Sequence, residues 1–165
     1  MKSDKLKYVV LAFAAVLVGL DQLFKWLAQT RLPPRPGGTL PLIQDVFHLT
    51  YLENRGAAFG IFQGKAFFLI GLTGLILLAL AGLILSGRLR SPFLLWTAGL
   101  IIGGGIGNLI DRIFRGYVID YLDFRLIHFA IFNFADCCVV VGTLLVLIKL
   151  VFFDREKPAE ETADA

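Results

Sequence analysis

The sequence predicts an all-α polytopic membrane protein with four transmembrane helices and a small loop region that contains β-structure. Composition is the first observation, since 57% of the 165 residues are hydrophobic and the mean hydropathy is +0.75. The second is that four apolar windows of about 20 residues are each long enough to cross the hydrocarbon core of a bilayer. The third is that the aspartates near these windows gather toward one end. A carboxylate is costly in hydrocarbon, so such acids usually mark a working site.

The four predicted helices follow one another along the chain. They cover residues 8–28, 66–86, 92–113 and 131–153. Residues 1–153 are therefore expected to form a single four-helix integral membrane domain, with no room for a second soluble domain. The tail 154–165 has no apolar periodicity and is expected to be disordered in the cytoplasm.

The first window resembles a secretory signal peptide at its start, because Lys2, Lys5 and Lys7 precede an apolar run. The run continues past Asp21 to Ala28 without a clear small-residue cleavage site. We therefore expect the first helix to be retained.

Four spans place both chain ends on one side of the membrane and the loops 29–65 and 114–130 on the other. Lysines and arginines are divided equally between the two sides, so their raw count leaves the orientation undecided. The lysines ahead of the first helix, with Arg88 and Arg90 in the short turn 87–91, favour cytoplasmic termini. Residues 42–54 and 118–129 are expected to form short strands or interfacial segments over the helix ends.

Several kinds of site are disfavoured by the residue pattern. Cys137 and Cys138 are adjacent within the fourth helix, where neither zinc-ligand spacing nor a disulfide is expected, so they are interpreted as packing residues. The net charge of +3 is spread over loops and ends, which disfavours a nucleic-acid partner.

Two polar motifs precede the third helix. Asp21 and Lys25 are spaced i, i+4 and form an expected ion pair, which either braces a site or simply neutralises itself. Asn54 and Gly56 begin a glycine-containing stretch, 54–60, where the backbone either approaches a ligand closely or forms a plain turn.

Two further motifs lie at the loop ends of the third and fourth helices. The glycines of 103–107, Gly104 among them, are interpreted as helix-packing residues that lead to Asn108, Asp111 and Arg112. In the second loop, Val118 and Asp120 precede Asn133, Ala135 and Asp136, so Asp120 is expected to fold back over Asp136. At a rise of 1.5 Å per residue, Asp136 is expected about 8 Å into its helix.

Two carboxylates in one semi-desolvated site do not both ionise cheaply, so one of them holds a proton near neutral pH. Such a pair is suited to hydrolysis, in which the ionised acid activates water and the protonated acid hydrogen-bonds the scissile carbonyl. No serine, histidine or cysteine set competes with it. From the residues alone, hydrolysis by Asp120 and Asp136 and a proton or ion relay remain equal alternatives.

Together the motifs resemble those of the bacterial lipoprotein signal peptidases, the type II signal peptidases that cut prolipoproteins. The resemblance covers nearly the whole chain. It rests on Asp-x-x-x-Lys at 21–25, Asn-x-Gly-Ala-Ala-Phe at 54–59, Gly-x-x-x-Asn-x-x-Asp-Arg at 104–112, Val-x-Asp at 118–120 and Phe-Asn-x-Ala-Asp at 132–136.

The resemblance implies a membrane-embedded aspartic endopeptidase with Asp120 and Asp136 as its catalytic dyad. The other motif residues would bind substrate or support the site: Asp21, Lys25, Asn54, Gly56, Gly104, Asn108, Asp111, Arg112, Val118, Asn133 and Ala135. The implied substrates are prolipoproteins with a diacylglyceryl-modified cysteine, cut on the amino side of that cysteine. Neither a metal nor an organic cofactor is implied, and we expect a monomer that contacts membrane lipids.

The resemblance also implies a multi-pass protein of the cell inner membrane with cytoplasmic termini. Its β-containing loops and its chemistry would then lie at the extracytoplasmic face, which decides the tied charge count. A proton-coupled transporter would need polar groups through the whole membrane, whereas these acids lie near one end. A structural subunit would explain the packing glycines but not five motifs that converge on one face.

Overall fold

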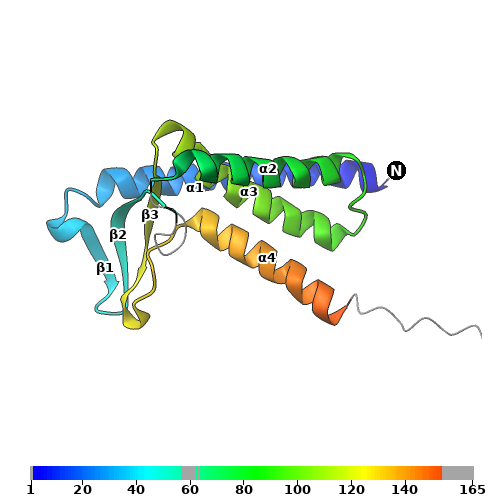
Figure 1. The fold of residues 1–165 in the computed structure, drawn as a ribbon. Coiled ribbons are helices and arrows are strands. Elements are labelled where there is room, and N and C mark those ends of the chain that lie inside the picture. The colour runs from blue at the N-terminus through cyan, green and yellow to red at the C-terminus, as the bar shows by residue number, and fades with distance from the viewer. Residues whose placement is uncertain (1, 57–61, 63, 154–165) are drawn as a thin grey trace, which may run out of the picture.

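The computed structural model describes residues 2–56, 62 and 64–153, and it contains four long helices and one small sheet in this part of the chain. The helices are α1 (Lys2–Arg31), α2 (Ala66–Leu85), α3 (Pro92–Phe114) and α4 (Phe134–Phe152). The strands are β1 (Thr39–Ile43), β2 (Phe47–Asn54) and β3 (Val118–Phe124). The sheet projects from one end of the helices, and the amino terminus lies at the opposite end (Figure 1).

All four predicted membrane helices are confirmed, because each observed helix is long and apolar enough to cross a bilayer. Helix α1 extends beyond both ends of the predicted window 8–28. The outer faces of the bundle carry exposed apolar side chains, for example Leu75 and Leu78 of α2 at 67% and 74% exposure. In a membrane these faces contact lipid, so their exposure is not a packing defect.

Helix α3 lies at the centre of the bundle and contacts each of the other helices. Its glycines make these close approaches possible. A methyl group on Gly103 would lie 2.8 Å from the Leu17 side chain of α1, and one on Gly105 would lie 2.7 Å from Leu77 of α2. A methyl group on Gly104 would overlap the carbonyl oxygen of Ala135 in α4. The expectation that these glycines pack helices is confirmed.

The start of helix α4 differs from the prediction. The helix begins at Phe134 and not at 131, because Asn133 has extended backbone angles and forms the N-cap. Asp136 therefore lies in the first turn of the helix, so the depth of about 8 Å expected for it was too large.

Both loop segments form strands, as one of the two alternatives predicted. The segment 42–54 is divided, since β1 ends at Ile43 and a turn with Asp45 in the left-handed region leads into β2. Strand β3 is followed by a short 3-10 helix, Arg125–Ile127. The sheet is antiparallel with the order β1-β2-β3, and Ile119 and Tyr121 anchor it on the last turns of α1. The predicted tail 154–165 lies outside the described residues.

Candidate active site

Strand β3 and the start of α4 bring Asp120 and Asp136 to one place. Asp120 is 1% exposed and accepts two hydrogen bonds from side-chain amides. Asn54 Nδ2 donates to Asp120 Oδ2 at 2.8 Å, and Asn133 Nδ2 donates to Asp120 Oδ1 at 2.6 Å. Asn54 reaches this position because β2 pairs with β3, with Asn54 opposite Val118.

Asn133 links the two acids. Its Oδ1 accepts from the backbone N–H of Asp136 at 2.9 Å, and Asp136 Oδ2 accepts from the backbone N–H of Asn133 at 3.1 Å. This reciprocal pair is a capping box, which satisfies two N–H groups at the helix start. Because the Nδ2 group of the same asparagine donates to Asp120, one residue both begins the helix and fixes the two carboxylates relative to each other.

Asn108 of α3 holds the other oxygen of Asp136. Its Nδ2 donates to Asp136 Oδ1 at 2.7 Å, and its Oδ1 accepts from Lys25 Nζ at 2.8 Å and from Asn133 Nδ2 at 3.2 Å. Two donors on Oδ1 determine which end of the amide faces Asp136. Asn108 therefore connects the site acid Asp136 to the buried cation Lys25.

A buried charge cluster lies beside the acids. Lys25 Nζ is 2.8 Å from Asp21 Oδ2 and 3.2 Å from Asp111 Oδ2, and all three residues are fully buried. The predicted Asp21–Lys25 ion pair is confirmed. Lys25 also forms an ion pair with Asp111, which was not predicted. Arg115 pairs with Asp111 as well, so two cations balance two carboxylates.

This cluster holds the backbone next to each site acid. Asp111 Oδ2 accepts from the N–H of Ile119 at 3.0 Å, one residue before Asp120. Asp21 Oδ1 accepts from the N–H of Ala135 at 3.1 Å, one residue before Asp136. The buried carboxylates therefore position the backbone on which both site acids are carried.

Arg112 connects α3 to the loop after β2. Its Nη2 donates to the carbonyl oxygen of Gly56 at 3.1 Å, and the N–H of Gly56 donates to Asn54 Oδ1 at 2.9 Å. This places Asn54, Gly56 and Arg112 in one chain of contacts that ends at Asp120. The rest of the predicted loop motif, 57–59, lies outside the described residues.

Burial raises the pKa of Asp120 from 3.8 to about 7, and repulsion from the nearby Asp136 carboxylate adds to this shift. The amides of Asn54 and Asn133 oppose it, because they hydrogen-bond the ionised form. The Asp120 carboxyl is therefore able to hold a proton near neutral pH.

Both acids line one cavity of about 1030 Å³. Its polar end also contains Asn54, Asn108 and Arg112, and its walls are apolar residues of α2, α3 and α4. The apolar wall residues include Ile76, Leu77, Ile101, Val139 and Val140. Among the described residues, no group of three or more His, Cys, Asp or Glu side chains is placed to hold a metal ion.

Sequence reasoning missed two members of the charge cluster. Gln22 Nε2 donates to Asp21 and Asp111 at 3.2 Å each, and Gln22 Oε1 accepts from Arg115 Nη1 at 3.3 Å. The signal for Arg115 was present, because it stands four residues after Asp111, the same spacing as Lys25 after Asp21. Nothing in the sequence indicated Gln22, whose role depends on the close approach of α1 and α3.

Comparisons with known proteins agree with this arrangement. The family model described as signal peptidase (SPase) II matches residues 13–152. Proteins named lipoprotein signal peptidase from Brevibacillus brevis and Halothermothrix orenii are 42% and 45% identical over 145 and 136 residues. These matches cover 87% and 82% of this chain, and 95% and 90% of the relatives.

Two solved structures, each described as a bacterial membrane enzyme, share the fold. Their TM-scores are 0.78 and 0.77 at 28% and 31% identity. They match 90% and 88% of this chain, and 93% and 94% of their own chains. Since the relatives agree with it over nearly their full length, in sequence and in fold, this chain belongs to the signal peptidase II family.

Proposed function

We propose that this protein is a membrane-embedded aspartic endopeptidase that removes the signal peptide from diacylglyceryl-modified prolipoproteins. Membership of the signal peptidase II family supports the substrate class. The observation that carries the catalytic assignment is the placement of two carboxylates, Asp120 and Asp136, linked by Asn133 and open to one large apolar-walled cavity. In such a pair one carboxylate acts as general base and the other, protonated, acts as general acid, which is what acid–base hydrolysis requires.

In the proposed reaction the two acids share one proton. The ionised carboxylate takes a proton from water, whose oxygen attacks the scissile carbonyl carbon. The protonated carboxyl hydrogen-bonds the carbonyl oxygen and stabilises the charge that develops there. When the C–N bond breaks, the proton that the first carboxylate took from water passes to the nitrogen of the modified cysteine. Asn54, Asn108 and Asn133 orient the carboxylates. Arg112 lines the cavity and holds the carbonyl oxygen of Gly56.

The cavity suits a substrate that is itself embedded in lipid. A signal peptide presents its cleavage point as unwound backbone, whose polar groups need partners at this depth. The polar end of the cavity, with Asn54 and Arg112, offers such partners, and the apolar walls of α2, α3 and α4 suit the peptide helix and the acyl chains. The proposed enzyme acts as a monomer, with residues 1–153 as its single membrane domain.

We also propose the cell inner membrane as the location, with the termini in the cytoplasm and the acids near the extracytoplasmic face. The lysines ahead of α1 and the Arg88 and Arg90 turn support this orientation. Reporter fusions at Gly38 and after Lys157 test it. An inside signal at Gly38 together with an outside signal at Lys157 would invert the orientation.

The decisive experiment on substrate class uses the purified protein and a matched pair of prolipoprotein peptides, with and without the diacylglyceryl thioether. We expect cleavage of the modified peptide alone, with a product that begins at the lipidated cysteine. Equal cleavage of both peptides, or a cut elsewhere, would contradict the proposal. Mass spectrometry of both fragments provides the readout.

A further inference from the structure

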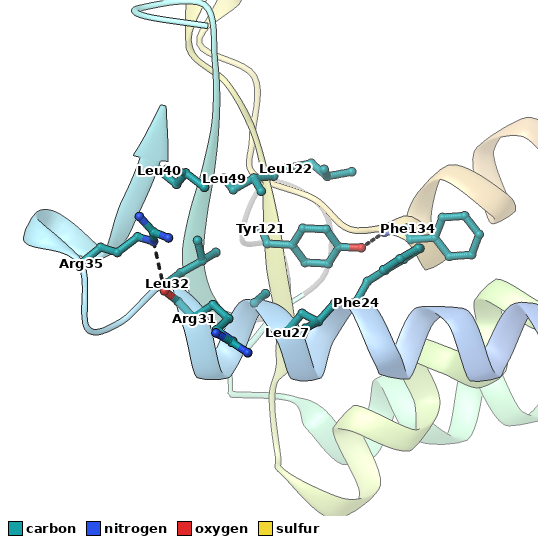
Figure 2. A pocket seen from close by; sticks show the side chains of 11 residues that line it. Phe24, Leu27, Arg31, Leu32, Arg35, Leu40, Leu49, Tyr121, Leu122 and Phe134 are labelled. Carbon is teal, nitrogen blue, oxygen red and sulfur yellow. Dashed lines mark hydrogen bonds between the residues drawn. The ribbon is translucent and has the colours of Figure 1, made fainter. Parts of the chain in front are cut away.

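A second cavity lies where the end of α1 meets the sheet, and it shares no lining residue with the cavity that holds the acids. Its volume is about 380 Å³, within the range of small-ligand pockets. Figure 2 shows its walls, with Leu40 and Leu49 of the sheet on one side and the side chains of α1 on the other. Tyr121 and Phe134 close it toward the start of α4.

The interior of this second cavity is apolar. The phenolic oxygen of Tyr121, the one polar side-chain atom among the described residues at this end of the cavity, accepts from the backbone N–H of Phe134 at 3.3 Å. The other wall side chains toward the bundle are hydrocarbon, among them Phe24, Leu27 and Leu122. An occupant of this interior is therefore expected to be an alkyl chain and not a polar molecule.

Helix α1 contributes a single stripe to the cavity, from Phe24 through Leu27 and Ala28 to Arg31. These residues recur at the spacing of one helix face. Phe24 and Leu27 are about one-third exposed on the lipid-facing flank, at 36% and 37%. At 1.5 Å per residue, Arg31 lies about 10 Å farther along the helix axis than Phe24, toward the sheet. The stripe thus leads from apolar side chains within the helix to a charged side chain at its sheet end.

Two arginines, Arg31 and Arg35, line the surface end of the cavity. Arg35 Nε donates to the carbonyl oxygen of Arg31 at 3.2 Å, which ties the second arginine to the end of the helix. The other arginines described near the sheet have partners within the protein. Arg55, Arg115 and Arg125 form ion pairs with carboxylates. Arg112 donates hydrogen bonds to two backbone carbonyl oxygens.

Within the part of the chain that the structure describes, neither Arg31 nor Arg35 pairs with a carboxylate. A helix C-terminus favours cations, which accounts for Arg31 in the last turn and for the bond from Arg35 Nε to the Arg31 carbonyl. Two guanidinium groups at one helix end still repel each other. A bound anion would offset that repulsion.

We propose that this cavity binds an anionic glycerophospholipid, with one acyl chain along the α1 stripe and the phosphate at Arg31 and Arg35. Charge complementarity selects the anionic headgroup, and the apolar interior with its opening on the lipid flank selects an acyl chain over a free anion. The site is separate from the peptidase cavity, so it adds a lipid-binding function to this face of the protein.

Native mass spectrometry of the detergent-solubilised full chain tests the proposal. Phosphatidylglycerol and phosphatidylcholine with identical acyl chains are titrated separately, and inorganic phosphate forms a third arm. We expect phosphatidylglycerol to bind about 25-fold more tightly than phosphatidylcholine, at about fivefold for each arginine. Arg31→Gln with Arg35→Gln should abolish this preference. The matched control is Arg88→Gln with Arg90→Gln, which removes two exposed arginines from the opposite side and should leave the preference intact.

A cavity-filling variant, Ala28→Leu, tests the acyl chain, because Ala28 is buried in the wall. It should weaken the binding of both lipids about tenfold while leaving their ratio unchanged. Equal binding of the two lipids by the wild type would overturn the proposal. So would inorganic phosphate binding as tightly as phosphatidylglycerol, or a preference that survives in the Arg31 and Arg35 double variant. The arginine variants decide the matter by themselves if Ala28→Leu does not fold.

Discussion

Replacing Lys25 by methionine should lower both the stability of the fold and the rate of cleavage. Methionine keeps most of the length of the side chain and removes the charge. The ammonium group of Lys25 contacts Asp21 at 2.8 Å, Asp111 at 3.2 Å and Asn108 at 2.8 Å, all within a fully buried cluster. The substitution therefore removes the central cation from two carboxylates and one amide.

The size of the stability loss depends on the partners that Asp21 and Asp111 retain. Asp111 retains Arg115, whereas Asp21 retains only neutral donors, Gln22 and the N–H of Ala135. Breaking a buried pair costs about 3–5 kcal/mol, and because one acid keeps a cation we expect about 3 kcal/mol. Cleavage should fall further in the molecules that remain folded. Asn108 loses a donor to Oδ1, so its amide is held less firmly toward Asp136, and a lost hydrogen bond of this kind corresponds to about a tenfold drop in kcat.

Denaturant unfolding in detergent micelles measures the stability, and kcat is measured on the lipidated peptide under conditions where each variant is folded. The double variant Asp21→Asn with Lys25→Met removes both charges and keeps an acceptor for the N–H of Ala135. It should regain about 2 kcal/mol over the single variant, since the stranded carboxylate is gone. The reasoning is refuted if Lys25→Met is as stable as the wild type, or if the double variant is no more stable than the single one.

Three further predictions concern the site acids and the packing of α3. Burial raises the pKa of Asp120 to about 7, so its proton is present below that pH and lost above it. We therefore expect kcat/KM to fall as the pH rises through about 7. It should also fall at acid pH, where both carboxyl groups of the pair are protonated and no base remains. A rate that stays flat to high pH would contradict a shared proton. Gly104→Ala should cost about 1–3 kcal/mol by pushing α3 from α4, while Gly82→Ala, whose methyl group meets nothing within 4 Å, should be nearly neutral in denaturant unfolding. Asp111→Asn should lose about 1–3 kcal/mol but keep part of its cleavage, and complete loss at unchanged stability would place Asp111 in the dyad.

The fold could be predicted from the sequence to a large extent because membrane helices have a strong local signal. Four apolar windows gave four helices, and the glycines of 103–107 indicated where helices approach closely. The start of α4 was predicted wrongly for a physical reason. Residues 131–133 are compatible with a helix by composition, yet Asn133 forms the cap and turns its amide toward Asp120, a partner that lies thirteen positions away.

Contacts of the candidate site between residues close in sequence could be predicted. Contacts between residues far apart in sequence could not. The pair Asp21 and Lys25 follows from helix periodicity. The link from Asn133 to Asp136 is also local, but it is a capping box at the helix start and not a contact along one helix face. The contact of Lys25 with Asp111 joins α1 to α3, and the bond from Arg112 to Gly56 joins α3 to a loop. Such contacts depend on how helices are rotated against each other, which no local pattern specifies. The proposed lipid cavity was not predicted either, because its apolar wall comes from five separate elements, α1, β1, β2, β3 and α4.

The assignment of Asp120 and Asp136 as the catalytic dyad is tested most directly by single-turnover cleavage of a diacylglyceryl-modified prolipoprotein with the purified Asp120→Asn and Asp136→Asn variants. The amide has nearly the same shape as the carboxyl, so both variants should insert and unfold like the wild type. Each removes a group that must give or take a proton, and we expect cleavage to fall by about 10²–10⁴-fold or more. Cleavage at a near wild-type rate by either folded variant would contradict the dyad.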